Sequence, residues 1–163
     1  MAKKTSLTKL PKLNIKDNPT NCCPRFLPSD WDNKEFKFDK KQFVLGHTTS
    51  FLYVPLNMGS MMKKVWGEVE KAGAYEEGEF VMLSRDLSPW KAEHYLSVSK
   101  KVPGLSNTTI SGTFRTRVFE GPFKDAPKWI AEMNSDLVYL YYTTCPKCLK
   151  VYGKNYVVAF TKI

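Results

Sequence analysis

Hydrophobic and polar positions follow a regular pattern along the chain from residue 43 onward. Residues 43–54 are rich in β-branched and aromatic side chains and are closed by Pro55, which is typical of a strand. Asn57 is placed to act as the N-cap of a helix. Ala72-Gly73 then supplies a C-terminal stop signal. Between them, apolar residues recur at steps of three and four, which predicts one buried helix face: Met58, Met61, Met62, Val65, Trp66 and Val69.

The order of elements is then repeated. Two shorter strands are predicted at residues 79–85 and 92–102, so the first set reads strand, helix, strand, strand. A second set follows, with a strand at residues 108–119, a short helix after Asp125, and two closing strands at residues 137–144 and 155–163. Both sets have a Pro at the end of the first strand and a Trp in the helix: Pro55 and Pro122, Trp66 and Trp129. The two sets share little identity, so the predicted repeat rests on element order.

The N-terminal region differs from the rest of the chain. Residues 1–35 have no hydrophobic period, and we interpret them as a basic tail and an irregular segment. Trp31, Phe36 and Phe38 would pin that segment to the domain. Residues 36–163 are predicted to form a single α+β domain of two strand-helix-strand-strand units related by a pseudo-two-fold axis. A groove between such units is a natural place for a ligand.

Composition and charge exclude several classes of function. The 163 residues are 42% hydrophobic, which is ordinary for one globular domain. The net charge of +9 attracts polyanions, but five of the lysines lie in the first sixteen residues, and no arginine-rich block or basic stripe is present. We therefore expect no specific nucleic-acid partner. No apolar run is long enough to span a bilayer and no secretory signal is present, which predicts a cytoplasmic protein without a membrane partner.

Four cysteines are the most specific candidates for metal binding. Cys145 and Cys148, in the sequence CPKC followed by a Gly-Lys turn, resemble a metal-binding knuckle, which needs two further ligands. Cys22 and Cys23 would complete a tetrahedral four-thiolate zinc site, although neighbouring side chains on an extended chain point to opposite sides. A thioredoxin-like role is disfavoured because only a few residues separate Cys148 from Gly153, which leaves no room for a long helix. Disulfides are disfavoured in a reducing compartment, and four buried or idle thiols are the remaining alternative.

The histidines and serines give no catalytic motif. His47 and His94 lie in predicted strands without a neighbouring ligand motif. His94 alternates with Leu96 and Val98, so we expect a hydrogen-bonded core histidine. No Gly-x-Ser-x-Gly sequence supports a serine hydrolase triad, and no glycine-rich loop supports phosphate binding.

Glu120 lies where a predicted strand gives way to a helix, within RVFEGPFKDAPKW. Counting by twos from Ile110 places Glu120 at the end of a largely apolar strand face. Burying a carboxylate without a partner is costly, so Glu120 either reaches solvent in the Gly-Pro turn or faces a polar pocket. In a pocket it would serve as a general base or as the counter-charge of a cationic ligand.

Aromatic residues make up 13% of the chain and supply candidate walls for such a pocket. Flat rings stack on planar ligands and on cations, although most rings in a domain of this size fill the core. The candidates are Trp66, Trp90, Tyr95, Phe114, Tyr139, Tyr141 and Tyr142, with Glu93 and Tyr142 as further polar groups.

The duplicated element order and the strand-to-helix junction FEGPF resemble the gyrase-inhibitor-like superfamily of small-molecule effector-binding domains. More narrowly, the chain resembles a family of bacterial proteins assigned to that superfamily. The sequences that carry this resemblance are CCPRF, WD, VPLNMG, SRDLSPW, FEGPFKDAPKW, TTCPKC and YGKNYVV. The narrow resemblance runs from about Cys22 to the C-terminus. The superfamily resemblance implies a cleft that binds planar, often cationic molecules, and some stand-alone members hydrolyse strained electrophiles. The chain departs from the superfamily in its cysteines and in lacking a DNA-binding domain.

Together these observations predict a stand-alone domain that binds a planar or cationic aromatic molecule in an aromatic cleft, with Glu120 as the central acid. One alternative is a hydrolase of small strained electrophiles that uses the same Glu. A second alternative is a structural or interaction module organised by zinc at the four cysteines.

Overall fold

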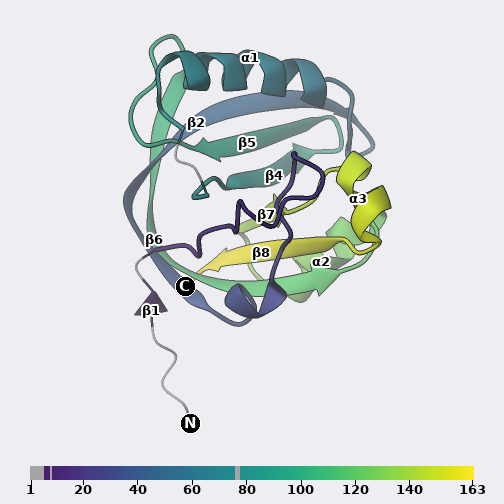
Figure 1. The fold of residues 1–163 in the computed structure, drawn as a ribbon. Helices are drawn as coiled ribbons and strands as arrows, with labels where there is room; N and C mark the ends of the chain where they lie inside the picture. The colour runs from purple at the N-terminus through teal and green to yellow at the C-terminus, as the bar shows by residue number, and fades with distance from the viewer. Residues whose placement is uncertain (1–5, 8, 76–77) are drawn as a thin grey trace. The chain divides into compact units, whose positions relative to one another are not determined.

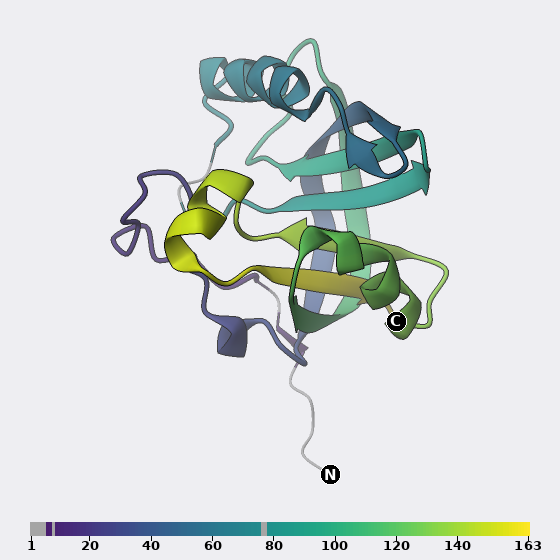
Figure 2. The ribbon, with the colours of Figure 1, turned by 90° about the vertical axis from the view of Figure 1, so that its right-hand side faces the viewer.

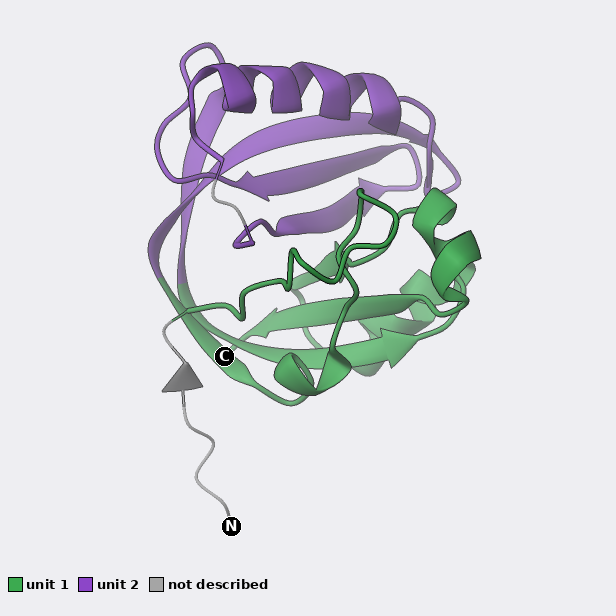
Figure 3. Cartoon of the chain, in the orientation of Figure 1, with its two compact units in different colours: residues 1–38, 112–163 green, residues 39–111 purple. Residues whose placement is uncertain are grey.

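The computed structural model describes residues 6–7, 9–75 and 78–163, and the chain has an α+β fold. It divides into two compact units (Figure 3): unit 1 comprises residues 1–38 and 112–163, and unit 2 comprises residues 39–111. The unit boundaries therefore fall within two long strands, β2 (Glu35–Phe51) and β6 (Ser106–Glu120). The division of the chain into a tail and a single domain over residues 36–163 stays a prediction.

In the described part of unit 2, one long helix packs on a set of antiparallel strands. β5 (Lys91–Ser97) lies between β2 and β4 (Met82–Ser88), and α1 (Met58–Lys71) packs on this sheet (Figure 1). The backbone of β2 approaches α1 closely at Gly46, where an added Cβ would lie 2.6 Å from Met61 Sδ. The core between helix and sheet consists of Val44, Met61, Val65, Val69, Ala74, Leu96, Val98 and Val102.

The predicted helix in this unit is confirmed. Asn57 is its N-cap residue, although its side-chain Oδ1 accepts a hydrogen bond from the Thr49 backbone N–H (2.8 Å) rather than capping the helix. Met61, Val65 and Val69 are buried, at one-turn spacing on one face. Each such side chain contributes roughly 1.5–3 kcal/mol when it is fully buried, so packing on the sheet holds α1 in place.

The bounds of β2, β4 and β5 differ from the prediction. β2 begins at Glu35 rather than at residue 43, because Phe36 and Phe38 already alternate as buried residues among charged ones. It ends at Phe51, and a two-residue turn joins it to the short strand β3 (Val54–Pro55), where the sequence predicted one continuous strand. β4 covers Met82–Ser88 rather than residues 79–85, because its hairpin with β5 turns at Pro89-Trp90, and β5 ends at Ser97 rather than at residue 102.

In the described part of unit 1, two short helices connect three of the strands, which pair antiparallel. β8 (Tyr156–Lys162) lies between β6 and β7 (Val138–Tyr142). The short 3-10 turn η2 (Phe123–Asp125) leads into α2 (Ala126–Glu132), whose Trp129 ring stacks on Phe119 with ring centroids 5.6 Å apart. A second helix, α3 (Pro146–Tyr152), connects β7 to β8 (Figure 2).

The two units share one strand order. In unit 2 the first strand, β2, pairs with the last strand, β5, which pairs with β4. In unit 1, β6 pairs with the last strand, β8, which pairs with β7. The strand-helix-strand-strand order is therefore present in each unit, interrupted by β3 in one and by α3 in the other.

The N-terminal segment is packed into unit 1. β1 (Ser6–Leu7) pairs parallel with the start of β2, and η1 (Pro28–Asp30) precedes Trp31, which is only 3% exposed. The Asp32 side chain accepts a hydrogen bond from the Val118 backbone N–H at 2.9 Å. Trp31 is thus an integral core residue, whereas the predicted tail at residues 1–5 and residue 8 lies outside the described residues. No helix among the described residues is long and apolar enough to cross a membrane.

Candidate functional site

A row of three polar side chains crosses the sheet of unit 2. Glu93 on β5 is directly opposite His47 on β2 and Arg85 on β4. Directly opposed residues project from the same sheet face, with Cβ atoms roughly 5 Å apart. Val44 and Leu96 alternate with this row and belong to the core under α1, so the row lies on the sheet face away from the helix. We refer to His47, Glu93 and Arg85 as the polar row.

Glu93 is the buried centre of the polar row. Its residue is 8% exposed, and its Oε1 accepts a hydrogen bond from the Tyr95 hydroxyl at 3.1 Å. Arg85 Nη1 lies 3.6 Å from the same Oε1. A buried carboxylate requires such partners. Because both contacts use Oε1, they leave Oε2 for a water molecule or a ligand.

This arrangement has the parts of an acid–base site. A carboxylate oxygen accepts a proton from water, while a guanidinium and a phenol stabilise negative charge that develops nearby. His47 is exposed at the other side of Glu93 and offers a second proton-transfer group. Glu93 and Tyr95 were predicted as site residues, and the sheet register adds His47 and Arg85 to them.

The opposite sheet face carries a different histidine. His94 is 2% exposed, its Nδ1 is 2.8 Å from Ser84 Oγ, and its Nε2 is 2.9 Å from Thr48 Oγ1. Both ring nitrogens therefore have hydroxyl partners, which confirms the predicted hydrogen-bonded core histidine. Burial, and then the charge of His47, lower the pKa of His94 to about 4.

His94 is expected to make the free energy of unfolding fall in acid. In the unfolded chain a histidine binds its proton near pH 6.5, whereas folded His94 does so only near pH 4. The unfolded state therefore gains a proton first as the pH falls through this window, at a cost to stability of about 3 kcal/mol. Urea unfolding at several pH values measures this loss. His94→Gln should flatten the dependence, whereas His47→Gln should retain it; an unchanged slope in His94→Gln would contradict the assignment.

The two predicted tryptophans of unit 2 lie apart from the polar row. Trp66 is on α1, where its Nε1 donates to Glu70 Oε1 at 2.8 Å and its ring contacts Tyr75 and Phe80. Trp90 is 54% exposed at the β4–β5 turn and contacts the Phe51 ring. Of the candidates in this unit, the structure brings only Glu93 and Tyr95 together.

The candidates of unit 1 are also separated. Glu120 is exposed at the end of β6 opposite Tyr156, while Tyr142 is opposite Val157 and so projects from the other sheet face. Phe114 is 1% exposed and packs between the rings of Phe38 and Tyr139. The geometry favours a surface position for Glu120, and a role of these three residues in ligand binding stays a prediction.

A hollow of about 560 Å³ opens beside the end of α2 in unit 1. None of the predicted site residues lines it. Its lining residues are Ile130, Ala131, Asn134, Ser135 and Asp136.

The four cysteines come together in unit 1. Their sulfur atoms all lie within 4.8 Å of one another, and none forms a disulfide. Cys22 Sγ is 3.7 Å from Cys23 Sγ and 3.9 Å from Cys145 Sγ. Four thiolates at about 2.3 Å from a tetrahedral metal ion are roughly 3.8 Å apart. The cluster therefore has the ligand number and spacing of a four-thiolate metal site.

A bend in the N-terminal segment lets the adjacent Cys22 and Cys23 converge. Asn21 has a φ of 54°, and the chain bends through residues 21–23 rather than extending. The backbone N–H groups of both cysteines lie 3.4 Å from Thr20 Oγ1. Because the chain is bent here, the side chains of Cys22 and Cys23 do not point to opposite sides as they would on an extended chain.

The second cysteine pair belongs to a helix that the sequence did not predict. Cys145 is the N-cap of α3, Cys148 is buried in its first turn, and Gly153 ends the helix with a φ of 73°. The Cys145 backbone N–H donates to Cys23 Sγ at 3.5 Å. The short distance from CPKC to Gly153 left no room for a long helix, and the two turns of α3 are enough to present both thiols.

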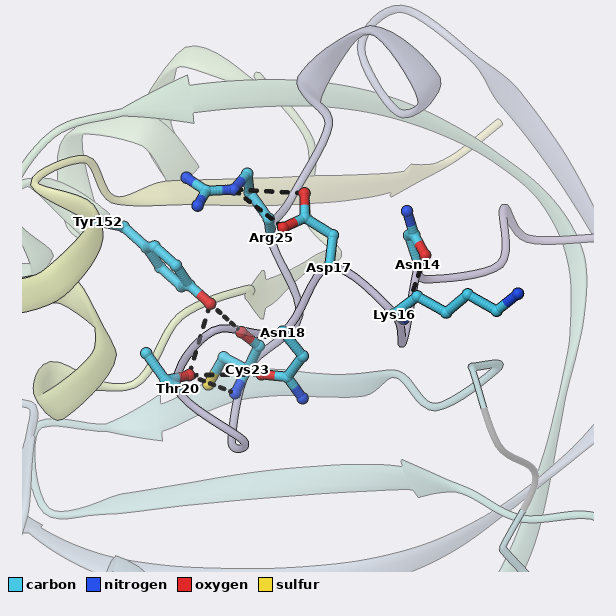
Figure 4. Close-up of polar contacts among 8 residues, drawn as sticks. All are labelled: Asn14, Lys16, Asp17, Asn18, Thr20, Cys23, Arg25 and Tyr152. Atoms are coloured by element: carbon cyan, nitrogen blue, oxygen red, sulfur yellow. Dashed lines mark hydrogen bonds and ion pairs between the residues drawn. The ribbon is translucent and has the colours of Figure 1, made fainter.

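Polar contacts join α3 to the N-terminal segment around the cluster (Figure 4). The Tyr152 hydroxyl donates to the Cys23 backbone carbonyl and contacts Thr20 Oγ1 at 3.4 Å. Arg25 lies over the Tyr152 ring and pairs with Asp17 at 3.3 Å. These contacts hold the two cysteine-bearing segments beside each other.

The thiols of the cluster differ in acidity. Burial raises the pKa of Cys148, but its hydrogen-bond contacts with Thr20, Cys145 and Cys23 outweigh burial and lower that pKa to about 7. Burial is the main reason that the pKa values of Cys22 and Cys23 are raised. A metal ion at this cluster would displace the thiol protons, since thiolates are the ligands.

Comparison with known proteins gives one family match. A family model described as "Bacterial hydrolase" matches residues 13–163. No curated protein matches the chain. The matched range includes the polar row of unit 2 and the four cysteines of unit 1.

Proposed function

Because the chain belongs to the bacterial hydrolase family, we propose that it hydrolyses small molecules at the polar row, with Glu93 as the general base. The observation that carries this proposal is the buried Glu93 carboxylate between His47 and Arg85, with Oε2 outside its protein contacts. The family description supports hydrolysis as the class of reaction, and the geometry of the polar row supports our choice of site. We also retain the strained electrophile as the substrate class that the sequence resemblance implied.

The proposed reaction is addition of water to a strained ring, such as an epoxide. Glu93 takes a proton from water, the resulting hydroxide oxygen bonds to a ring carbon, and the bond from that carbon to the ring heteroatom breaks. Arg85 and Tyr95 stabilise the negative charge on the heteroatom. His47 in its protonated form gives that atom a proton, and the proton on Glu93 returns to solvent.

We further propose that the two strand-helix-strand-strand sets are copies of one unit, as in the gyrase-inhibitor-like superfamily. The shared strand order of unit 1 and unit 2 supports this relation. In such a protein, binding of a planar cation without turnover is the alternative to hydrolysis, and product formation separates the two.

Glu93→Gln is expected to lower the rate of hydrolysis by at least about 100-fold, because amide nitrogen and oxygen cannot replace the base. Purified protein would be incubated with a panel of epoxides, aziridines and planar cations, and products would be followed by mass spectrometry. Glu120→Gln is the matched control, since it makes the same change at an exposed strand end in unit 1.

The two variants also separate the alternatives. Loss of product in Glu120→Gln with full activity in Glu93→Gln would move the site to unit 1 and contradict the proposal. Saturable binding of a planar cation, with no product from any compound, would replace hydrolysis by binding.

We also propose that the four cysteines hold one structural zinc ion. Four soft thiolate ligands within 4.8 Å of one another favour zinc over hard cations. A four-thiolate set leaves no open position for water or substrate, so the ion would take no part in hydrolysis. Its role would be to tie the N-terminal segment to the β7–β8 connection within unit 1.

A further inference from the structure

Unit 2 carries an exposed apolar surface at the end of two hairpins. We call it the apolar tip, and its residues are each 48–68% exposed: Phe51, Leu52, Tyr53, Val54, Leu56 and Trp90. Soluble proteins rarely gather so many large apolar side chains on one exposed surface without a partner.

Backbone and ring contacts join the two hairpins into one surface. The Ser50 N–H donates to the Trp90 carbonyl at 2.7 Å, and the Tyr53 N–H donates to the Pro89 carbonyl at 2.9 Å. The rings of Phe51 and Trp90 have centroids 5.6 Å apart. The β2–β3 turn and the β4–β5 turn therefore present their apolar residues together, at the same edge of unit 2 (Figure 2).

Turn stability does not explain the residues at the apolar tip. Leu52 and Tyr53 form the two-residue turn between Phe51 and Val54, and both have positive φ values, of 46° and 70°. Such turns favour Asn-Gly, because most side chains are strained in this backbone region. A large apolar pair in a strained turn points to selection for contact with a partner.

The chemistry of the apolar tip fits a lipid bilayer surface. Trp90 and Tyr53 combine an apolar ring with a polar group, which suits the boundary between hydrocarbon and water. The tip projects from hairpin ends, so it is shaped to insert rather than to enclose a small molecule.

The charges around the apolar tip fit anionic headgroups. The chain carries no Asp or Glu from residue 40 to residue 67, whereas Lys63 and Lys64 are exposed on α1, shortly after the tip. Lys91 is exposed next to Trp90. Asp86 on β4 is half-buried and contributes less to this surface. Cationic side chains beside an inserted apolar surface strengthen binding to anionic lipids.

We propose that the apolar tip docks the protein on an anionic bilayer, with Phe51, Leu52 and Trp90 inserted at the interface and the neighbouring lysines on headgroups. The sequence predicted no membrane partner because no segment is long enough to span. Peripheral docking through two turns requires no spanning segment.

The test uses the full chain and lipid vesicles, and it does not depend on hydrolysis. Wild-type protein should sediment with vesicles of phosphatidylcholine containing phosphatidylglycerol, and much less with phosphatidylcholine alone. The double variant Leu52→Asn/Tyr53→Gly should bind at least about tenfold more weakly. Its melting temperature should be unchanged or higher, because Asn-Gly suits the turn. Val151→Asn, which removes an exposed apolar side chain on α3, is the matched control and should bind as the wild type does.

The other outcomes each overturn a part of the proposal. Unchanged vesicle binding in the double variant, or no binding by the wild type, would overturn docking through the apolar tip. Equal binding to both vesicle types would overturn the role of the lysines. A dimer in analytical ultracentrifugation that the double variant dissociates, without vesicle binding, would assign the tip to a second copy of this chain.

Discussion

Cys148→Ser is expected to abolish zinc binding and to lower the melting temperature by about 10 °C, because a loss of a few kcal/mol shifts a chain of this size by that amount. Cys148 is 1% exposed and lies within 4.8 Å of three other sulfur atoms. A serine hydroxyl stays protonated and is a poor zinc ligand, so three thiolates would remain. Because the ligands come from both the N-terminal segment and α3, losing the ion would remove the cross-link between these two parts of unit 1.

Metal analysis and thermal unfolding together check this expectation. Purified wild-type protein should contain one zinc ion per chain, and a chelator should lower its melting temperature to that of Cys148→Ser. The chelator should not affect the variant. Lys147→Ser is the matched control, since it changes an exposed residue between the two cysteines of the same helix and should keep the metal. A metal-free wild type that melts well above the variant would assign the loss to packing of Cys148 alone.

Trp31→Ala is expected to cost roughly 3–5 kcal/mol, as deletion of a buried Trp side chain does. The Trp31 ring lies 5.4 Å from the Tyr141 ring and 5.9 Å from the Phe26 ring, between centroids. It also contacts Phe36 and Phe160. It therefore joins the N-terminal segment to β7 and β8 of unit 1, and its loss would leave a cavity among aromatic rings that cannot collapse fully.

Urea unfolding of two variants tests the contribution of Trp31. Trp90→Ala removes the same side chain where it is 54% exposed, and should cost about 0.5 kcal/mol or less. Similar losses in the two variants would show that Trp31 does not anchor the segment. The comparison needs no activity assay, so it stands whether or not the proposed hydrolysis is correct.

The sequence predicted elements well where one face of a helix or strand is buried. Met61, Val65 and Val69 give α1 its period, and the structure has that helix over Met58–Lys71. Patterns were less informative where residues of high strand propensity adopt a turn. Leu52 and Tyr53 continue the apolar run of β2, yet their positive φ values end the strand, and no local preference of Leu or Tyr indicates this.

The site depended on register, which the sequence does not specify by itself. Glu93 and Tyr95 were candidates from residue type, but His47 joins them through the β2–β5 register and Arg85 through the β4–β5 register. The turn at Pro89-Trp90 alone would place Asp86 opposite Glu93, and the register shift between Asp86 and Ser88 is what brings Arg85 to that position. The four-cysteine site was one of the alternatives from the sequence, because a four-thiolate site needs every cysteine in the chain, and the structure brings all four together.

Because the chain is synthesised from its N-terminus, the two units differ in when their buried contacts are able to form. Unit 2 is one continuous segment, and its buried contacts, such as Thr48 with His94, join residues 46 positions apart. Unit 1 is made of the first and last parts of the chain, and Cys145 contacts Cys23 across 122 positions. Contacts between distant residues form late, since their loops close slowly. During translation, the rings of Phe26 and Trp31 therefore stay exposed until β7 and β8 have been synthesised. This makes the nascent N-terminal segment the part of the chain most in need of a chaperone.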